Sequence, residues 1–89
     1  MLDDLGEHVR RERQVARKLR RTRWWHNLRD NSNCHYCSEP LTKSRATMDH
    51  VVALRLGGRS TKDNIVPCCL PCNRKKRDDY MVDWFRKTF

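Results

Sequence analysis

Two Cys-x-x-Cys pairs carry the clearest chemical signal in this chain of 89 residues. Cys34 and Cys37 form the first pair and Cys69 and Cys72 the second, with 31 residues between the pairs. Four thiolates at this spacing can complete a tetrahedral shell around Zn²⁺, which leaves no coordination position open for a substrate. The pattern therefore predicts a structural zinc site. Metal binding of this kind contributes about 10 to 16 kcal/mol, which would compensate for the small core of so short a chain.

Cys68 and His35 are the alternative ligands for this zinc site. Cys68 could replace Cys69, but only Cys69 leaves the two-residue gap to Cys72 that lets both sulfurs of one turn face the same metal. His35 lies inside the first pair, and we expect it to be a partly exposed residue of the turn.

A second set of residues that can do chemistry lies between the pairs and just after them: Asp49, His50, Asn64 and Asn73. Asp49 and Asn73 offer oxygen ligands, which suit Mg²⁺ or Mn²⁺ and compete poorly with four thiolates for Zn²⁺. The imidazole of His50, with an ordinary pKa of about 6.5, is mostly neutral at cellular pH and can accept a proton from an attacking water. Hydrolysis of a phosphodiester requires such a base, together with a metal that stabilises charge on the phosphate and on the leaving 3′ oxygen.

Each of these residues has a simpler explanation when it is taken alone. An Asp-His step at a strand end usually makes a surface hydrogen bond, and an asparagine before a strand is usually a turn residue. Asn73 could be an ordinary residue at the start of a helix, where asparagine is favoured. The nuclease interpretation rests on the joint occurrence of these residues, in register, with two zinc-type cysteine pairs.

The segment from Cys34 to about Arg77 resembles the HNH (ββα-metal) endonuclease family, in the group whose ββα unit is held by a four-cysteine zinc site. The Asp-His step, an asparagine 14 residues after His50 and a second asparagine nine residues further on all match the family motif. The resemblance implies an α+β fold, a small ββα-metal domain that contains structural Zn²⁺ and catalytic Mg²⁺ or Mn²⁺. Two positions differ from the family pattern: Ala53 replaces a common proline, and Asn73 replaces the last histidine of the family name.

The resemblance also implies a role for Asn64 that is not metal binding. Its amide is expected to tie together the loop of residues 55–64 and so to hold His50 in orientation. Adjacent residues of a strand point to opposite faces, so Asp49 and His50 can approach one phosphate only if the strand ends or bulges at this point.

The N-terminal third of the chain is strongly basic. Lysine and arginine number 20 against 11 acidic residues in the whole chain, and the formal net charge of +9 indicates a polyanionic partner. The helical spacing of the apolar residues, without glycine or proline from residue 7 to residue 38, predicts a helix over residues 2 to about 29. This helix could pack its apolar stripe on the rest of the domain, bind phosphates, or do both. Trp24 and Trp25 near its end are expected to pack over the small core rather than to stack on bases.

The composition divides the chain into a basic helical extension over residues 1–30 and an HNH domain over residues 31–89, within one compact unit. Two short strands are expected at residues 49–52 and 65–66, and a C-terminal helix is expected from about Pro71. The face of this helix that is turned toward the strands would carry six residues: Asn73, Arg77, Tyr80, Met81, Trp84 and Phe85.

Together these features predict a metal-dependent endonuclease that hydrolyses DNA, nicking one strand per site with low sequence specificity; nothing in the sequence excludes RNA. A double-strand break would need a second nick or a dimer. Eight basic residues are the expected contacts to nucleic acid: Arg17, Lys18, Arg20, Arg21, Arg74, Lys75, Lys76 and Arg77. Two other classes of protein compete with this interpretation, a non-catalytic zinc-stabilised nucleic-acid-binding module and a thiol redox protein.

The sequence also bears on where the protein is found. The longest uncharged stretch has ten residues, too few to cross a membrane. Asp3, Asp4 and Glu7 interrupt the start of the chain, where a signal peptide would need an apolar run. Five cysteines, an odd number, in a chain without an export signal favour reduced thiols over disulfides. We therefore expect a cytoplasmic protein.

Overall fold

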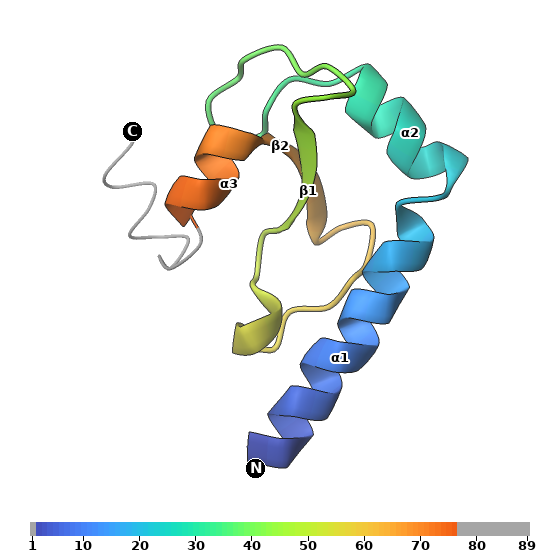
Figure 1. Ribbon diagram of the computed structural model, residues 1–89, viewed down its shortest axis with the longest axis vertical. Helices are drawn as coiled ribbons and strands as arrows, with labels where there is room; N and C mark the ends of the chain where they lie inside the picture. Colours follow the sequence, from blue (N-terminus) through green and yellow to red (C-terminus); the bar gives the residue numbers. More distant parts are fainter. Residues whose placement is uncertain (1, 77–89) are drawn as a thin grey trace.

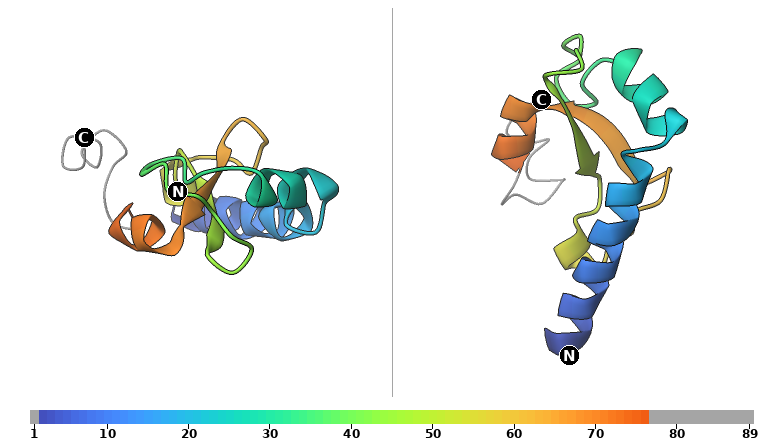
Figure 2. Two further views of the ribbon diagram at one scale, coloured as in Figure 1. Left: turned by 90° about the horizontal axis from the view of Figure 1, so that it is seen from above. Right: turned by 45° about the vertical axis from the view of Figure 1, so that its right-hand side comes forward.

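The computed structural model describes residues 2–76. The elements follow one another along the chain as α1 (Leu2–Leu19), α2 (Arg23–Asp30), β1 (Ala46–His50), the 3₁₀-helix η1 (Leu54–Leu56), β2 (Ile65–Cys69) and α3 (Leu70–Lys76). Two antiparallel strands followed by a helix give the predicted α+β fold with its ββα order. Figure 1 and Figure 2 show α3 and α1 on opposite sides of this sheet. The predicted helix residues Tyr80, Met81, Trp84 and Phe85, and the basic residue Arg77, lie outside the described residues.

The basic N-terminal segment forms two helices, so the prediction of one helix over residues 2 to about 29 is wrong at residues 20–22. The hydroxyl of Thr22 accepts a hydrogen bond from the backbone N–H of Trp25 (3.3 Å) and donates one to the carbonyl of Leu19 (2.6 Å). One side chain therefore terminates α1 and caps α2. Figure 1 shows that α2 turns away from the direction of α1 and leads the chain back toward the sheet.

The two strands are longer than predicted and begin or end at different residues. β1 pairs with β2 from Ala46 opposite Cys69 to His50 opposite Ile65. β1 therefore ends at His50, where an end or bulge was expected. β2 continues through Pro67, which was expected to close it, because both strands of a two-stranded sheet are edge strands and tolerate proline.

The core is small and rich in sulfur. Its buried cluster consists of Cys34, Tyr36, Leu41, Cys68, Cys69 and Cys72. Cys68 is completely buried, and its thiol donates to the carbonyl of Cys69 (3.2 Å). Trp25 is also buried, as the packing interpretation predicts, and Trp24 lies under the ammonium of Lys62, 5.5 Å from the ring centre.

Helix α1 is attached to the rest of the domain through the loop between η1 and β2. His8 Nε2 donates to the carbonyl of Gly58 (2.7 Å), and Glu12 accepts hydrogen bonds from the backbone and side chain of Ser60 (2.5 and 2.6 Å). No helix within residues 2–76 combines the length and apolar character needed to cross a bilayer.

Replacing Cys72 with serine is expected to unfold the domain. The variant loses one of the four thiols that could hold a metal ion, those of Cys34, Cys37, Cys69 and Cys72. A structural metal site contributes about as much free energy as the whole stability of a small domain. Thermal unfolding and elemental analysis of the purified protein measure the effect. Cys68→Ser is the matched control, because this buried cysteine lies outside the four-thiol cluster and its loss should leave the zinc content unchanged. A Cys72→Ser variant with the melting temperature of the wild type would contradict a structural metal.

Candidate metal centre and active site

Four cysteines meet at the junction of β2 and α3. The sulfur atoms of Cys34, Cys37, Cys69 and Cys72 all lie within 4.8 Å of one another, and those of Cys37 and Cys69 are 3.8 Å apart. These four residues are thus positioned to bind one metal ion, as the two Cys-x-x-Cys pairs predict. A complete set of thiol ligands suits Zn²⁺ in a structural role. His35 is exposed and lies outside this cluster, with its ring edge-on to Tyr36.

Backbone hydrogen bonds favour the thiolate form of Cys34, one of the four cysteines. Burial acts to raise the pKa of Cys34, but hydrogen bonds from the backbone of Cys37, Cys69 and Tyr36 bring this pKa down to about 6. The N–H of Cys69 lies 3.4 Å from the Cys34 sulfur. Burial raises the pKa of Cys72. Since metals bind the deprotonated form of cysteine, the cluster would release protons when it binds a metal.

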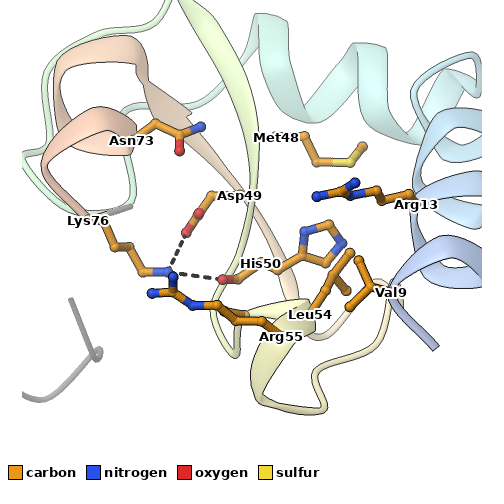
Figure 3. Close-up of a pocket in the computed structure, with 10 residues that line it drawn as sticks. Val9, Arg13, Met48, Asp49, His50, Leu54, Arg55, Asn73 and Lys76 are labelled. Atoms are coloured by element: carbon orange, nitrogen blue, oxygen red, sulfur yellow. Dashed lines mark hydrogen bonds and ion pairs between the residues drawn. The ribbon is translucent and has the colours of Figure 1, made fainter. Parts of the chain in front are cut away.

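A second site lies beside the metal centre, at the end of β1. Asp49, His50, Asn73 and Lys76 line one cavity of about 290 Å³. Figure 3 shows the Asp49 side chain directed toward α3 and the His50 ring directed toward α1, so the cavity extends across the end of the strand. Three of the four residues expected at the candidate site therefore line one cavity, and they come from two elements, β1 and α3.

Asn64 does not line this cavity and instead ties the following loop together. Its Oδ1 accepts from the N–H of Val52 (2.8 Å), and its Nδ2 donates to the carbonyls of Val52 (3.1 Å) and Arg59 (2.8 Å). The carbonyl of Asn64 also accepts from the N–H of Val51 (2.9 Å). These bonds hold the residues that directly follow His50 against the start of β2, which is the arrangement that the resemblance implied.

Asp49 is neutralised by two neighbouring groups, neither of which was predicted to contact it. The hydroxyl of Tyr36 donates to its carboxylate, and Lys76 Nζ lies 3.1 Å from the same oxygen, Oδ2. Lys76 also donates to the carbonyl of His50 (3.0 Å). Only 7% of its side chain is exposed, so Lys76, expected on a surface that contacts nucleic acid, instead belongs to the wall of the cavity. Burial and the Asp49 carboxylate together raise the pKa of Tyr36, which therefore stays a donor.

Asn73 faces the sheet, as its position on the helix predicts. Its Nδ2 donates to the hydroxyl of Thr47 (2.8 Å), and this hydroxyl donates in turn to the carbonyl of Cys68 (2.8 Å). With the amide nitrogen fixed on Thr47, the amide oxygen lies on the side that faces the Asp49 carboxylate (Figure 3). Asp49 and Asn73 thus present oxygen atoms to the same cavity.

His50 is held neutral by its surroundings. Burial is the main cause of its lowered pKa; Asp49 acts against this effect, and the cations of Arg20 and Lys76 add to it. Its Nε2 lies 2.9 Å from the hydroxyl oxygen of Ser60. A neutral imidazole can accept a proton, so the environment of His50 is suited to a general base.

The family model of HNH endonucleases matches residues 34–79, which contain both cysteine pairs and all residues of the cavity except those from α1. The chain belongs to the HNH endonuclease family. The CRISPR-associated endonuclease Cas9 of Corynebacterium diphtheriae is 36% identical over 61 residues. This similarity covers 67% of the present chain and 6% of that protein, so the chain spans a small part of the relative's length.

Basic side chains from the N-terminal helices and from the HNH domain line the cavity and a neighbouring groove. Arg13 and Arg55 line the cavity itself. Next to it, on the other side of Met48, Arg20, Arg29 and Lys43 line a groove of about 430 Å³. Arg29 is paired with Asp30 (2.9 Å). Of these residues only Arg20 was among the expected contacts to nucleic acid, because basic side chains are frequent throughout the chain.

The remaining basic residues expected to contact nucleic acid are on the surface. Those described as exposed are Arg17, Lys18, Arg20, Arg21, Arg74 and Lys75. The first four lie at the end of α1 and in the turn to α2, and the last two lie on α3.

Replacing Asn64 with alanine is expected to loosen the loop after β1 and to lower the stability by about 1 to 2 kcal/mol, because three hydrogen bonds are lost at a partly exposed site. Amide hydrogen exchange of Val52 measures the local effect and should become faster. Asn64→Asp is the matched control, since it keeps the acceptor for the Val52 N–H and loses the donor. Unchanged exchange of this amide in Asn64→Ala would show that Asn64 does not hold the loop.

Proposed function

We propose that this HNH domain is a metal-dependent endonuclease that hydrolyses phosphodiester bonds of DNA, nicking one strand per site with low sequence specificity. The observation that carries the proposal is the single cavity in which oxygen atoms of Asp49 and Asn73 lie beside a neutral imidazole and several cations. Family membership supports nuclease activity in general, and the name of the Cas9 relative describes an endonuclease.

The donor atoms in the cavity fit a hard divalent cation. The contacts of Asp49 with Tyr36 and Lys76 both use Oδ2, which leaves Oδ1 for a cation, and the amide oxygen of Asn73 faces the same space. Carboxylate and amide oxygens are ligands that Mg²⁺ and Mn²⁺ accept. Such an ion would supply positive charge to the phosphate and to the leaving 3′ oxygen. Zn²⁺ would occupy the separate cluster of four thiols, where it supports the fold.

His50 is the proposed general base. Its neutral imidazole would take a proton from the attacking water, on the opposite side of the strand end from Asp49 (Figure 3). Arg55 would hold a phosphate oxygen by a charge-assisted hydrogen bond, and Lys76 would add positive charge from the wall of the cavity. One base and one pair of oxygen ligands serve one phosphodiester, so each domain would cut one strand.

The basic surface supports a nucleic-acid substrate that is bound through its phosphates. The exposed arginine and lysine residues of α1 and α3 can replace counterions along a phosphate backbone, a mode of binding that weakens with salt and does not read sequence. Low specificity follows from this mode of binding. The same chemistry would accept RNA, and a comparison of both substrates at one salt concentration would decide between them.

One observation favours a second candidate function, a non-catalytic nucleic-acid-binding module. Lys76 and Tyr36 already neutralise Asp49, so the fold satisfies this carboxylate with its own side chains. A non-catalytic module would need no divalent ion beside Asp49. The nuclease proposal requires in addition that a divalent ion binds Asp49 through Oδ1 while Lys76 stays on Oδ2.

Replacing His50 with alanine is expected to lower the rate of cleavage by at least about 100-fold, the typical contribution of a general base, while binding to DNA is retained. The assay follows conversion of supercoiled plasmid to the open-circle form with Mg²⁺ or Mn²⁺, with and without EDTA. His35→Ala is the matched control, because this histidine is exposed and lies outside the cavity. Binding without cleavage by the wild type under every divalent ion would support the non-catalytic module.

The rate of cleavage is expected to rise with pH and then to level off, with the midpoint below the ordinary imidazole pKa of about 6.5. Burial lowers the pKa of His50, so the neutral, proton-accepting form is reached at a lower pH than for an exposed histidine. Single-turnover rates across this pH range at saturating metal measure the profile. A rate that falls as pH rises would contradict the assignment of His50 as the base.

A further inference from the structure

Ser60 lies between the candidate base and helix α1. It is 4% exposed, although it belongs to the loop between η1 and β2. Its hydroxyl oxygen is 2.9 Å from His50 Nε2 on one side and 2.6 Å from the carbonyl oxygen of Glu12 on the other. A buried hydroxyl with two partners of this kind has a determined hydrogen-bond direction.

The single proton of Ser60 decides that direction. A carbonyl oxygen can only accept, so the hydroxyl proton must be donated to Glu12. The Ser60 oxygen is then available to His50 only as an acceptor, and Nε2 of His50 must carry a proton. In a neutral imidazole the other nitrogen, Nδ1, then holds the lone pair.

Helix α1 holds Ser60 in this position from two sides. The carboxylate of Glu12 accepts from the backbone N–H of Ser60 (2.5 Å), in addition to the bond between the hydroxyl and the carbonyl. One turn earlier on the same face of α1, His8 donates to the carbonyl of Gly58 (2.7 Å) in the same loop. The loop is tightly folded, since a Cβ at Gly58 would lie 1.8 Å from the carbonyl oxygen of Val52.

The same helix forms a wall of the cavity next to the imidazole. Figure 3 shows Arg13 and Val9, both from α1, beside the ring of His50. Arg13 follows Glu12 directly, so the hydrogen bonds to Ser60 also fix the part of α1 that lines the cavity.

We propose that Ser60 is a positioning residue that fixes neutral His50 as the Nε2–H tautomer, so that Nδ1 is the atom that accepts the proton of the attacking water, with Glu12 of α1 as the anchor. The assignment of Nδ1 to catalysis rests on the proposed function. The tautomer and the role of Ser60 do not, because they follow from the hydrogen bonds alone.

The test is nitrogen-15 NMR of the imidazoles in the full-length, zinc-loaded protein, at a pH well above the ordinary imidazole pKa of about 6.5. The His50 signals are identified by their loss in His50→Gln. We expect one tautomer, protonated at Nε2, with an Nε2 proton that exchanges slowly with water. A wild-type protein that is protonated at Nδ1 would overturn the proposal, and this measurement needs no Ser60 variant.

Two variants then test the role of Ser60. Ser60→Ala removes the acceptor, so the slowly exchanging Nε2 proton should be lost, whereas Ser60→Thr keeps the hydroxyl and should retain it. In the cleavage assay Ser60→Ala should lower kcat by about 10- to 100-fold with KM for the plasmid unchanged, because the buried side chain does not contact substrate. A slowly exchanging Nε2 proton that persists in Ser60→Ala would overturn the positioning role. An inactive wild type with the expected tautomer would instead contradict only the nuclease proposal.

Discussion

The four sulfur atoms at the junction of β2 and α3 come from parts of the chain that are far apart in the sequence. Cys34 and Cys37 lie in the loop before β1, and Cys69 and Cys72 lie where β2 passes into α3. Joining these segments fixes where α3 leaves the sheet, and this direction places Asn73 beside Thr47 and opposite Asp49. A metal in this cluster would therefore also control the geometry of the candidate active site, although it lies outside that site.

The second constraint is the charge inside a small cavity. A half-buried carboxylate next to an imidazole and several cations requires partners, and Asp49 finds them in Lys76 and Tyr36. These two contacts hold the carboxylate in place through Oδ2 and leave Oδ1 directed to the cavity where a divalent ion is proposed. Lys76 thus has two relations to the proposed metal. It would share the Asp49 carboxylate with the ion, and it contributes positive charge where a phosphate would bind.

Features that depend on short sequence patterns, at the centre of the fold, could be predicted. Contacts between residues far apart in the sequence could not. The cysteine spacing predicted the metal cluster, and helix periodicity predicted that Asn73 faces the strands, because both depend on local geometry. The break at Thr22 was missed because one threonine in a basic helical run gives no signal until its hydroxyl meets Leu19. The hydrogen bond between Ser60 and Glu12 joins residues 48 positions apart, and no sequence pattern predicts it.

Helix α1 lies outside residues 34–79, the segment that matches the HNH family, but it supplies the groups that hold the loop beside His50. A transplant of the ββα segment alone into another protein would carry Asp49, His50 and Asn73 and would leave behind the support for the imidazole. The unit needed for the proposed chemistry therefore extends upstream at least to His8, beyond the segment that matches the family.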